Sequence, residues 1–545
     1  GTLGLLFVIG SLLIAPWHTQ AQAIPPDRRF GAVEAFRAPQ AAVEAGVGWE
    51  RILFYWSELQ PNTPDEWNGF HVPDEWLASA DAGGREVVGL LKSTPQWATD
   101  GPAGCGVPRG LELPVEDDNN LWAGFVRRTV QMYAGRINRW IIWNEPDIAP
   151  GTYGAEWCGS VEEYYRLVKV AYLAAHQVNA DVSIHLGGLT HWHDQTYIRK
   201  FLAVAAADPT AAENGYYFDV ASVHIYFQTD TVGPIINDVQ AALAEYGLNK
   251  PVWVNETNAS PDSDPLWPVD RLCWRVSLEE QAVFLLQSFA LSLSAGAERI
   301  AVYKWQESGE AEPFGVLRAD GSRRPAFEAY KLITTHYAGT VAAYTERQTG
   351  YAIVTLDRGA TTTRVLWART NSDAAVSIPA LSTQARLIGP TGTERVIEPV
   401  DGRYAFTLPA ARCPDERSDF PLDHPRCSHG GPPNLLVEQN AGTPLPLSSA
   451  TPMATPVGTP TTVVTLTAEA TKESPLATPT TPPTPTSTAT LTPTATLTPT
   501  ATATLTPTVT PSPSPSPIPT RTETPFPTFT PTPFPAPSQS TSPYA

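Results

Sequence analysis

The feature that most constrains the fold of this chain is an alternation of two kinds of segment between residues 30 and 335. Short runs rich in β-branched and aromatic residues alternate there with longer amphipathic segments. Such an alternation is typical of repeated strand–helix units around a parallel sheet. The short runs predict eight strands, at residues 30–34, 51–55, 86–92, 139–143, 182–186, 219–224, 251–255 and 299–304.

The longer segments predict helices, among them 121–134, 161–178, 235–246 and 278–295. Ser277 and Glu280 open the last of these with the spacing of a capping box. Eight strand–helix units predict an α/β fold, a (β/α)8 TIM barrel, which we place at residues 24–337. In that fold, active sites lie at the carboxyl ends of the strands.

From residue 338 to 439 the pattern changes to short alternating strands. They are expected at 351–356, 363–368, 385–388, 395–397 and 404–408, with a last strand at 434–438. Turns rich in Gly, Asn and Asp separate them. This pattern predicts a small antiparallel β-sandwich after the barrel.

The two ends of the chain differ from the rest. Residues 1–23 form a short apolar run that ends in Ala21-Gln22-Ala23, which predicts a secretory signal peptide; without an initiator Met or a basic start, it is expected to be clipped. The apolar run is shorter than the about 20 residues that a bilayer span requires. We therefore expect a secreted, extracellular or cell-surface protein with no membrane span in the mature chain.

Residues 440–545 consist mainly of Thr, Pro, Ser and Ala. Such a composition buries too little apolar surface to offset the entropy of ordering it. We expect a disordered Thr/Pro-rich tail that acts as an extended spacer, or as an O-glycosylated stalk associated with a cell wall.

The formal net charge of −19 restricts the partners of the folded part. A strong acidic excess excludes nucleic-acid backbone binding as the main function and favours neutral partners.

Five cysteines in a secreted chain allow two disulfides and one leftover thiol. Cys413 and Cys427 flank a short insertion rich in Pro and Asp and are the first expected pair. Cys105 and Cys158 lie in loops expected on the same face of the barrel and are able to pair, which leaves Cys273 alone. No cysteine or histidine spacing predicts a structural zinc, and no cofactor is expected.

Two glutamates carry the strongest chemical signal. Glu145 lies in Trp143-Asn144-Glu145-Pro146 after the fourth strand, and Glu256 follows the seventh. Retaining glycoside hydrolysis requires two carboxyl groups about 5 to 5.5 Å apart across the anomeric carbon, one protonated and one ionised. Two glutamates on opposite sides of a barrel mouth supply such a pair. Taken alone, each is also compatible with an ordinary helix N-terminal residue.

With these motifs, segment 30–335 resembles the clan A glycoside hydrolases, retaining enzymes whose catalytic glutamates follow strands four and seven. The resemblance implies that Glu145 is the general acid/base and Glu256 the nucleophile. It further implies four roles in the site: Asn144 bonds the sugar 2-hydroxyl, Arg51 keeps the nucleophile ionised, His224 and Tyr226 form a His-x-Tyr pair beside it, and Trp305 lies under the sugar.

Within the clan, the chain is most similar to family 39, with families 5 and 30 behind it. The stretch 89–97, the sequence Tyr303-Lys304-Trp305 and the appended β-sandwich carry this likeness. This likeness does not identify the sugar on which the protein acts.

Other aromatic and histidine side chains near strand ends have two interpretations. Trp56, Trp97, Trp192 and Trp305 present flat faces for pyranose rings, or pack in the core; we favour sugar contact for Trp97 and Trp305. His185, His191 and His193 suggest a metal, but without nearby carboxylates we favour substrate-lining or solvent-facing roles.

The sequence thus predicts a secreted retaining glycoside hydrolase acting on a β-linked polysaccharide or oligosaccharide. The alternatives are a non-catalytic carbohydrate-binding barrel at the cell surface and a structural protein displayed on the tail. The joint presence of both glutamates and their supporting residues argues for the enzyme.

Overall fold

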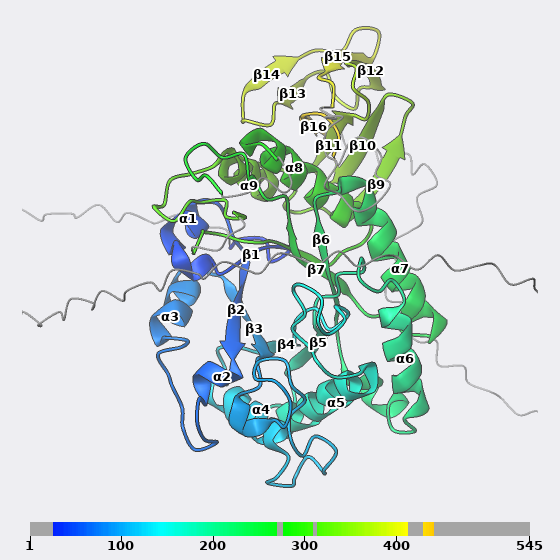
Figure 1. Ribbon diagram of the computed structural model, residues 1–545. Coiled ribbons are helices and arrows are strands. Elements are labelled where there is room, and N and C mark those ends of the chain that lie inside the picture. Colours follow the sequence, from blue (N-terminus) through cyan, green and yellow to red (C-terminus); the bar gives the residue numbers. More distant parts are fainter. Residues whose placement is uncertain (1–24, 270–275, 309–312, 412–428, 441–545) are drawn as a thin grey trace, which may run out of the picture. The chain divides into compact units, whose positions relative to one another are not determined.

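The computed structural model describes residues 25–269, 276–308, 313–411 and 429–440 (Figure 1). The proposed signal peptide, the tail from residue 441, Cys273 and the Cys413–Cys427 pair lie outside these residues. Within them, no helix combines the length and apolarity needed to cross a membrane.

Eight parallel strands form the barrel, as the alternation predicts. Their sheet order is β5-β4-β3-β2-β1-β8-β7-β6. Backbone hydrogen bonds from Leu186 to Val220 and from Leu189 to Ser222, each of 3.0 Å, join β5 to β6 and close the barrel. The strands are β1 (Phe30–Val33), β2 (Trp49–Tyr55), β3 (Glu86–Lys92), β4 (Arg139–Ile142), β5 (Ser183–Leu186), β6 (Ala221–Tyr226), β7 (Val252–Asn258) and β8 (Arg299–Val302).

Helices surround the strands, and the predicted bounds of α5 agree with the structure. The α-helices are α1 (Pro39–Glu44), α2 (Trp56–Leu59), α3 (Asp74–Ala82), α4 (Leu121–Met132), α5 (Val161–Val178), α6 (Tyr197–Ala207), α7 (Val232–Glu245), α8 (Leu278–Ser294) and α9 (Pro325–His336). Short 3-10 helices are η1 (Ala35–Arg37), η2 (Gln96–Ala98), η3 (Ala212–Tyr217) and η4 (Thr229–Thr231).

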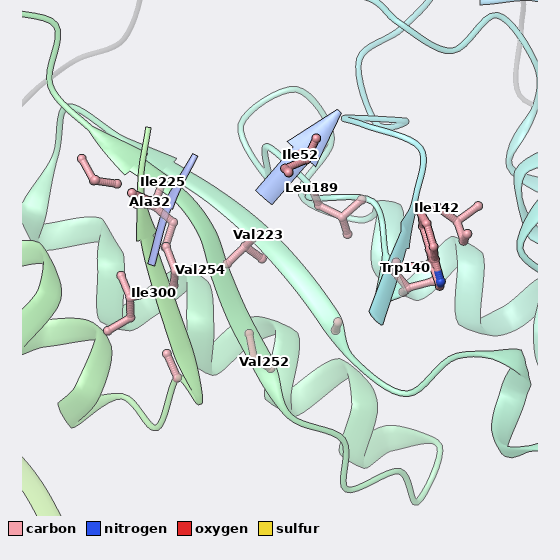
Figure 2. Close-up of a cluster of buried hydrophobic side chains, with 14 of the residues drawn as sticks. Ala32, Ile52, Trp140, Ile142, Leu189, Val223, Ile225, Val252, Val254 and Ile300 are labelled. Carbon is pink, nitrogen blue, oxygen red and sulfur yellow. The ribbon is translucent and has the colours of Figure 1, made fainter. Parts of the chain in front are cut away.

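The alternation of side chains along the strands divides the barrel core into two layers. Inward-facing residues include Trp49, Val88, Leu90, Ile141, Val220, Trp253 and Ala301, which form one buried cluster. Outward-facing residues such as Ile52, Val223, Val254 and Ile300 belong to the larger cluster between strands and helices, part of which Figure 2 shows. Because the interior of the barrel is filled by apolar side chains, polar functional groups are expected at the strand ends.

Helix α8 has the capping box that the sequence predicts. Ser277 Oγ accepts a hydrogen bond from Glu280 N at 3.1 Å, and Glu280 Oε2 accepts one from Ser277 N at 2.8 Å. The helix is buried on every side from Glu280 to Leu293. The second domain covers part of the helix: the side chain of Gln287 donates to Gly431 O at 2.9 Å and accepts from Gly430 N at 3.0 Å.

The second domain is a β-sandwich, as predicted. Its larger sheet has the order β14-β13-β16-β11-β10-β9, and β12 pairs with β15. The strands are β9 (Ala342–Arg347), β10 (Tyr351–Asp357), β11 (Thr361–Ala368), β12 (Ala374–Pro379), β13 (Ala385–Ile388), β14 (Glu394–Ile397), β15 (Arg403–Leu408) and β16 (Asn434–Gln439). Strands β9 and β12 are not among the strands predicted from the sequence. Strand β9 lies at a sheet edge with no fully buried residue. Strand β12 does alternate between buried and exposed residues, but Ala375 and Pro379 are apolar residues on its exposed face, which weakens the pattern in the sequence.

Candidate active site

The segment that carries Glu145 leaves strand β4 with an unusual backbone. Trp143 and Glu145 have positive φ angles of 70° and 44°, a conformation that non-glycine residues adopt mainly where surrounding contacts enforce it. Here Glu145 N donates to Gly188 O at 3.1 Å, and Trp143 Nε1 donates to Glu156 O at 2.8 Å. The backbone thereby aims the Glu145 side chain at the barrel mouth.

Asp147 anchors the same loop and was not singled out from the sequence. Its buried carboxylate accepts hydrogen bonds from Thr190 N at 3.1 Å, Thr190 Oγ1 at 2.7 Å and His191 N at 3.0 Å. These bonds join the loop after β4 to the loop after β5. A signal existed in the sequence, because an Asp directly after a candidate catalytic segment is a ready acceptor for loop amides.

Glu256 lies within β7, which extends three residues beyond its predicted end. Glu256 is 5% exposed, and its carboxylate contacts two side chains from other strands. Arg51 Nη2 lies 2.6 Å from Oε1, and Tyr226 donates its hydroxyl hydrogen to Oε2. Strands β2, β6 and β7 therefore converge on this one carboxylate.

His224 lies between the two glutamates. Its Nδ1 is 2.6 Å from Glu145 Oε1 and 3.4 Å from Glu256 Oε2. One ligand-type atom from each of these three residues lies within 4.8 Å of the others. The structure thus brings the two predicted carboxylates together with their predicted neighbours Arg51, His224 and Tyr226.

The environment shifts the pKa values of the two glutamates in opposite directions. Burial opposes ionisation of Glu256, but His224, Arg51 and the hydrogen bond from Tyr226 outweigh it and hold its pKa below the usual value. Burial raises the pKa of Glu145, to which the charges of Glu256 and Glu156 add, and this exceeds the opposite effect of His224. One carboxyl is therefore suited to carry a proton and the other to remain ionised.

Asn144 is half-buried beside Glu145. Within the described part of the chain, its Oδ1 is enclosed and has no hydrogen-bond partner. An amide oxygen without a protein partner next to the Glu145 carboxyl is an acceptor that a ligand hydroxyl could satisfy.

The expectation that Trp305 lies under the sugar is wrong. Trp305 is 0% exposed; it packs on Phe327 and Tyr330 of α9, and its Nε1 donates to Ala38 O at 3.1 Å. The alternative, core packing, is what the structure shows. Tyr303, which the sequence analysis used only as part of the family likeness, lies nearer the site, with its ring 6.1 Å from the ring of Tyr226.

Trp97 remains partly exposed in η2. Its Nε1 donates to Gln60 O at 2.7 Å, and its ring meets Trp56 edge-on at 5.8 Å. Trp56 itself is fully buried, whereas Trp192 is 37% exposed. Of the four tryptophans considered, Trp97 and Trp192 thus keep a face for a ligand.

A charged pair missed by the sequence analysis also lies near Glu145. Lys92, at the end of β3, places its Nζ 2.5 Å from Glu156 Oε2.

Cys105 and Cys158 form a disulfide that joins the loop after β3 to the loop after β4. This disulfide is the second of the two pairs considered from the sequence. Its Cys158 is two residues after Glu156, so the bond holds the backbone close to that glutamate.

The three histidines after and within β5 do not form one cluster. His185 is buried against Trp253, His191 Nε2 lies 3.3 Å from Asp238 Oδ2, and exposed His193 contacts Thr190. In the described part of the chain, the group close enough to share a metal ion is instead Glu145, His224 and Glu256.

Comparisons with known proteins concern the fold. No protein-family model and no curated protein matches the chain. Solved structures do match: a family 39 glycoside hydrolase from Bacteroides cellulosilyticus WH2 has a TM-score of 0.57 at 16% identity over 76% of this chain and 81% of its own.

Two further structures have TM-scores of 0.50. They are a monomeric β-xylosidase from Caulobacter crescentus CB15, at 13% identity over 76% of this chain and 97% of its own, and a family 30 subfamily 8 xylanase from Clostridium acetobutylicum, at 12% identity over 76% and 96%. The chain thus shares the fold of glycoside hydrolases of families 39 and 30, two of the families that the resemblance of its motifs had indicated.

Proposed function

We propose that this protein is a retaining glycoside hydrolase that cleaves O-glycosidic bonds in a β-linked polysaccharide or oligosaccharide. The observation that carries the proposal is the pair Glu145 and Glu256, which have oxygens within 4.8 Å of each other and pKa values displaced in opposite directions. A retaining mechanism uses carboxyl groups about 5 to 5.5 Å apart, whereas an inverting one needs about 6.5 to 9.5 Å to admit a water.

In the first step, the ionised carboxylate of Glu256 attacks the anomeric carbon. The bond from that carbon to the glycosidic oxygen breaks, and the Glu145 carboxyl gives its proton to the departing oxygen. A glycosyl ester on Glu256 results. Arg51 and Tyr226 hold the Glu256 carboxylate in place before attack, which their contacts with its two oxygens support.

The second step reverses these roles. The ester has no negative charge, so the pKa of Glu145 falls and its carboxylate takes a proton from water. The resulting hydroxide oxygen attacks the anomeric carbon, and Glu256 leaves as a carboxylate. Two inversions at the same carbon give a product of retained configuration.

Substrate contacts are proposed for the remaining predicted residues. The enclosed Oδ1 of Asn144 suits a hydroxyl of the sugar bound at Glu145, and Trp97 keeps a partly exposed face. Solved structures with this fold are named a β-xylosidase and xylanases, which makes β-linked xylan and xylo-oligosaccharides the first substrates to test. The proposal that the enzyme acts outside the cell rests on the N-terminal sequence alone.

Release of reducing ends from a panel of β-linked glycans by the purified chain tests the proposal. The wild type should be active, and Glu145→Gln and Glu256→Gln should each lose activity on natural glycans. Glu50→Gln is a matched control, because Glu50 is a fully buried glutamate paired with Arg85 rather than with the site. Glycan binding without release by the wild type would instead support a non-catalytic carbohydrate-binding barrel.

A further inference from the structure

Strand β7 is irregular immediately before Glu256. Its register shifts against β6 between Val223 and His224, and against β8 between Val254 and Thr257. A bulge of this kind adds one residue to a strand and redirects the side chains beside it. The residue at this position is Asn255, which is 0% exposed.

The amide oxygen of Asn255 and Nε2 of His224 lie on the same side of Gly188. A Cβ atom on Gly188 would lie 1.9 Å from His224 Nε2 and 2.8 Å from Asn255 Oδ1, so both atoms occupy the space above a residue that has no side chain. Among the residues that the structure describes, His224 Nε2 and both amide atoms of Asn255 have no hydrogen-bond partner. A hydrogen bond from Nε2–H to the amide oxygen would therefore satisfy two buried polar atoms without breaking another bond to protein.

The contacts of the other ring nitrogen, Nδ1, explain why a hydrogen-bond acceptor for His224 Nε2 matters. Nδ1 faces oxygens of both Glu145 and Glu256, and a hydrogen on Nδ1 lets the ring donate to either carboxylate. Burial and Arg51 disfavour a charged imidazole, but Glu256 and Glu145 outweigh them and raise the pKa of His224. A charged ring also carries a hydrogen on Nε2, which needs an acceptor in this buried place.

We propose that Asn255 is a positioning residue that acts through His224: its amide oxygen accepts the hydrogen bond from Nε2–H and keeps Nδ1–H directed at both catalytic glutamates. The catalytic consequence rests on the proposed function. During turnover the negative charge moves from Glu256 to Glu145, and a ring fixed by Asn255 stays in reach of whichever carboxylate is charged.

The first test measures His224 directly and requires no turnover. The full chain is labelled with 15N-histidine, and the His224 signals are assigned by their loss in His224→Gln. In Asn255→Leu, removal of the acceptor should lower the pKa of His224 by about one to two pH units, the loss of a hydrogen bond to a charged group. Asn255→Asp retains an acceptor and should show no such fall.

An unchanged His224 pKa in Asn255→Leu would overturn the proposal. If that variant does not fold, Asn255→Ala provides the same comparison with a smaller side chain. Ser292→Ala is the control for altering a buried polar residue, because Ser292 is fully buried on α8 and its Oγ also lacks a partner in the described part of the chain. This control should leave the His224 pKa unchanged.

The second test is the pH dependence of kcat/KM. Loss of the His224 charge raises the pKa of both Glu256 and Glu145, so both limbs of the profile should move to higher pH in Asn255→Leu. A wild type active on glycans with an unmoved profile in this variant overturns the inference and leaves the proposed function intact. A wild type inactive on every glycan overturns the proposed function, while the NMR titration still decides the role of Asn255.

Discussion

Arg51 Nη2 and Glu256 Oε1 lie 2.6 Å apart and join two strands, β2 and β7, across the inside of the barrel. Both residues are almost fully buried, at 2% and 5% exposure. Arg51 counteracts the cost of burying an ionised Glu256, and the pKa of Glu256 is lowered as a result.

Replacement of Arg51 should therefore change both the pH profile and the stability. In Arg51→Met the pKa of Glu256 rises, so the acid limb of kcat/KM moves to higher pH. Because a buried ion pair is broken, the free energy of unfolding should fall by about 3 to 5 kcal/mol. Arg85→Met is the matched control, because it breaks a buried pair with Glu50 outside the site. It should lose comparable stability but keep the wild-type acid limb; an equal shift in both variants would argue against a role for Arg51 in ionising Glu256.

The opposite shifts of the two glutamates predict a bell-shaped profile for the wild type. The proposed mechanism requires Glu256 ionised and Glu145 protonated. The acid limb should lie below pH 4.5 and the alkaline limb above it, since the two pKa values move down and up from that usual value. With an activated aryl glycoside, Glu145→Gln should abolish the alkaline limb of the first step, measured by pre-steady-state release of the phenol. If the alkaline limb persists in Glu145→Gln, that limb reports the titration of another group.

Gly188 should tolerate no side chain. A Cβ there would lie 1.9 Å from His224 Nε2, so Gly188→Ala must displace the ring between the glutamates. We expect kcat/KM to fall roughly 100-fold and stability to fall by about 1 to 3 kcal/mol. Gly124→Ala is the control: a Cβ at this position in α4 meets nothing within 4 Å, and it should stabilise the protein by about 0.5 to 1 kcal/mol. Wild-type activity in Gly188→Ala would show that the ring position is unimportant.

The disulfide between Cys105 and Cys158 should contribute to stability. Its sequence separation is 53 residues, which corresponds to a loss of about 4 kcal/mol on removal. The double variant Cys105→Ser, Cys158→Ser isolates this bond better than reduction, because it leaves the other three cysteines unchanged. Urea unfolding measures the difference, and a loss below about 1 kcal/mol would mean that the loops are held mainly by their other contacts.

The sequence was sufficient for the elements that depend on local pattern. Eight strands and the capping box of α8 follow from apolar periodicity and from Ser277 and Glu280. The placement of Glu145 after strand four, and of Glu256 near the carboxyl end of strand seven, follows from the same count, because strand ends in a parallel barrel share one face.

Features that depend on several strands at once could not be predicted. The irregularity at Asn255 is defined by the register of β7 against both neighbours. Trp305 lies beyond the end of β8, where strand alternation no longer indicates the side that a residue faces, and the structure places it in the core. The pair of Lys92 and Glu156 joins residues far apart in sequence, so no local spacing reveals it.

The most direct test of the account is the stereochemistry of azide rescue, measured by NMR on the glycosyl azides formed from an activated aryl glycoside. Glu256→Ala should regain activity with azide and give the inverted product, because azide takes the place of the nucleophile and displaces the aglycone in one step. Glu145→Ala should give the retained product, because azide attacks the ester already formed on Glu256. The reverse pattern would exchange the two roles, and full activity of either variant without azide would contradict the assignment of this site.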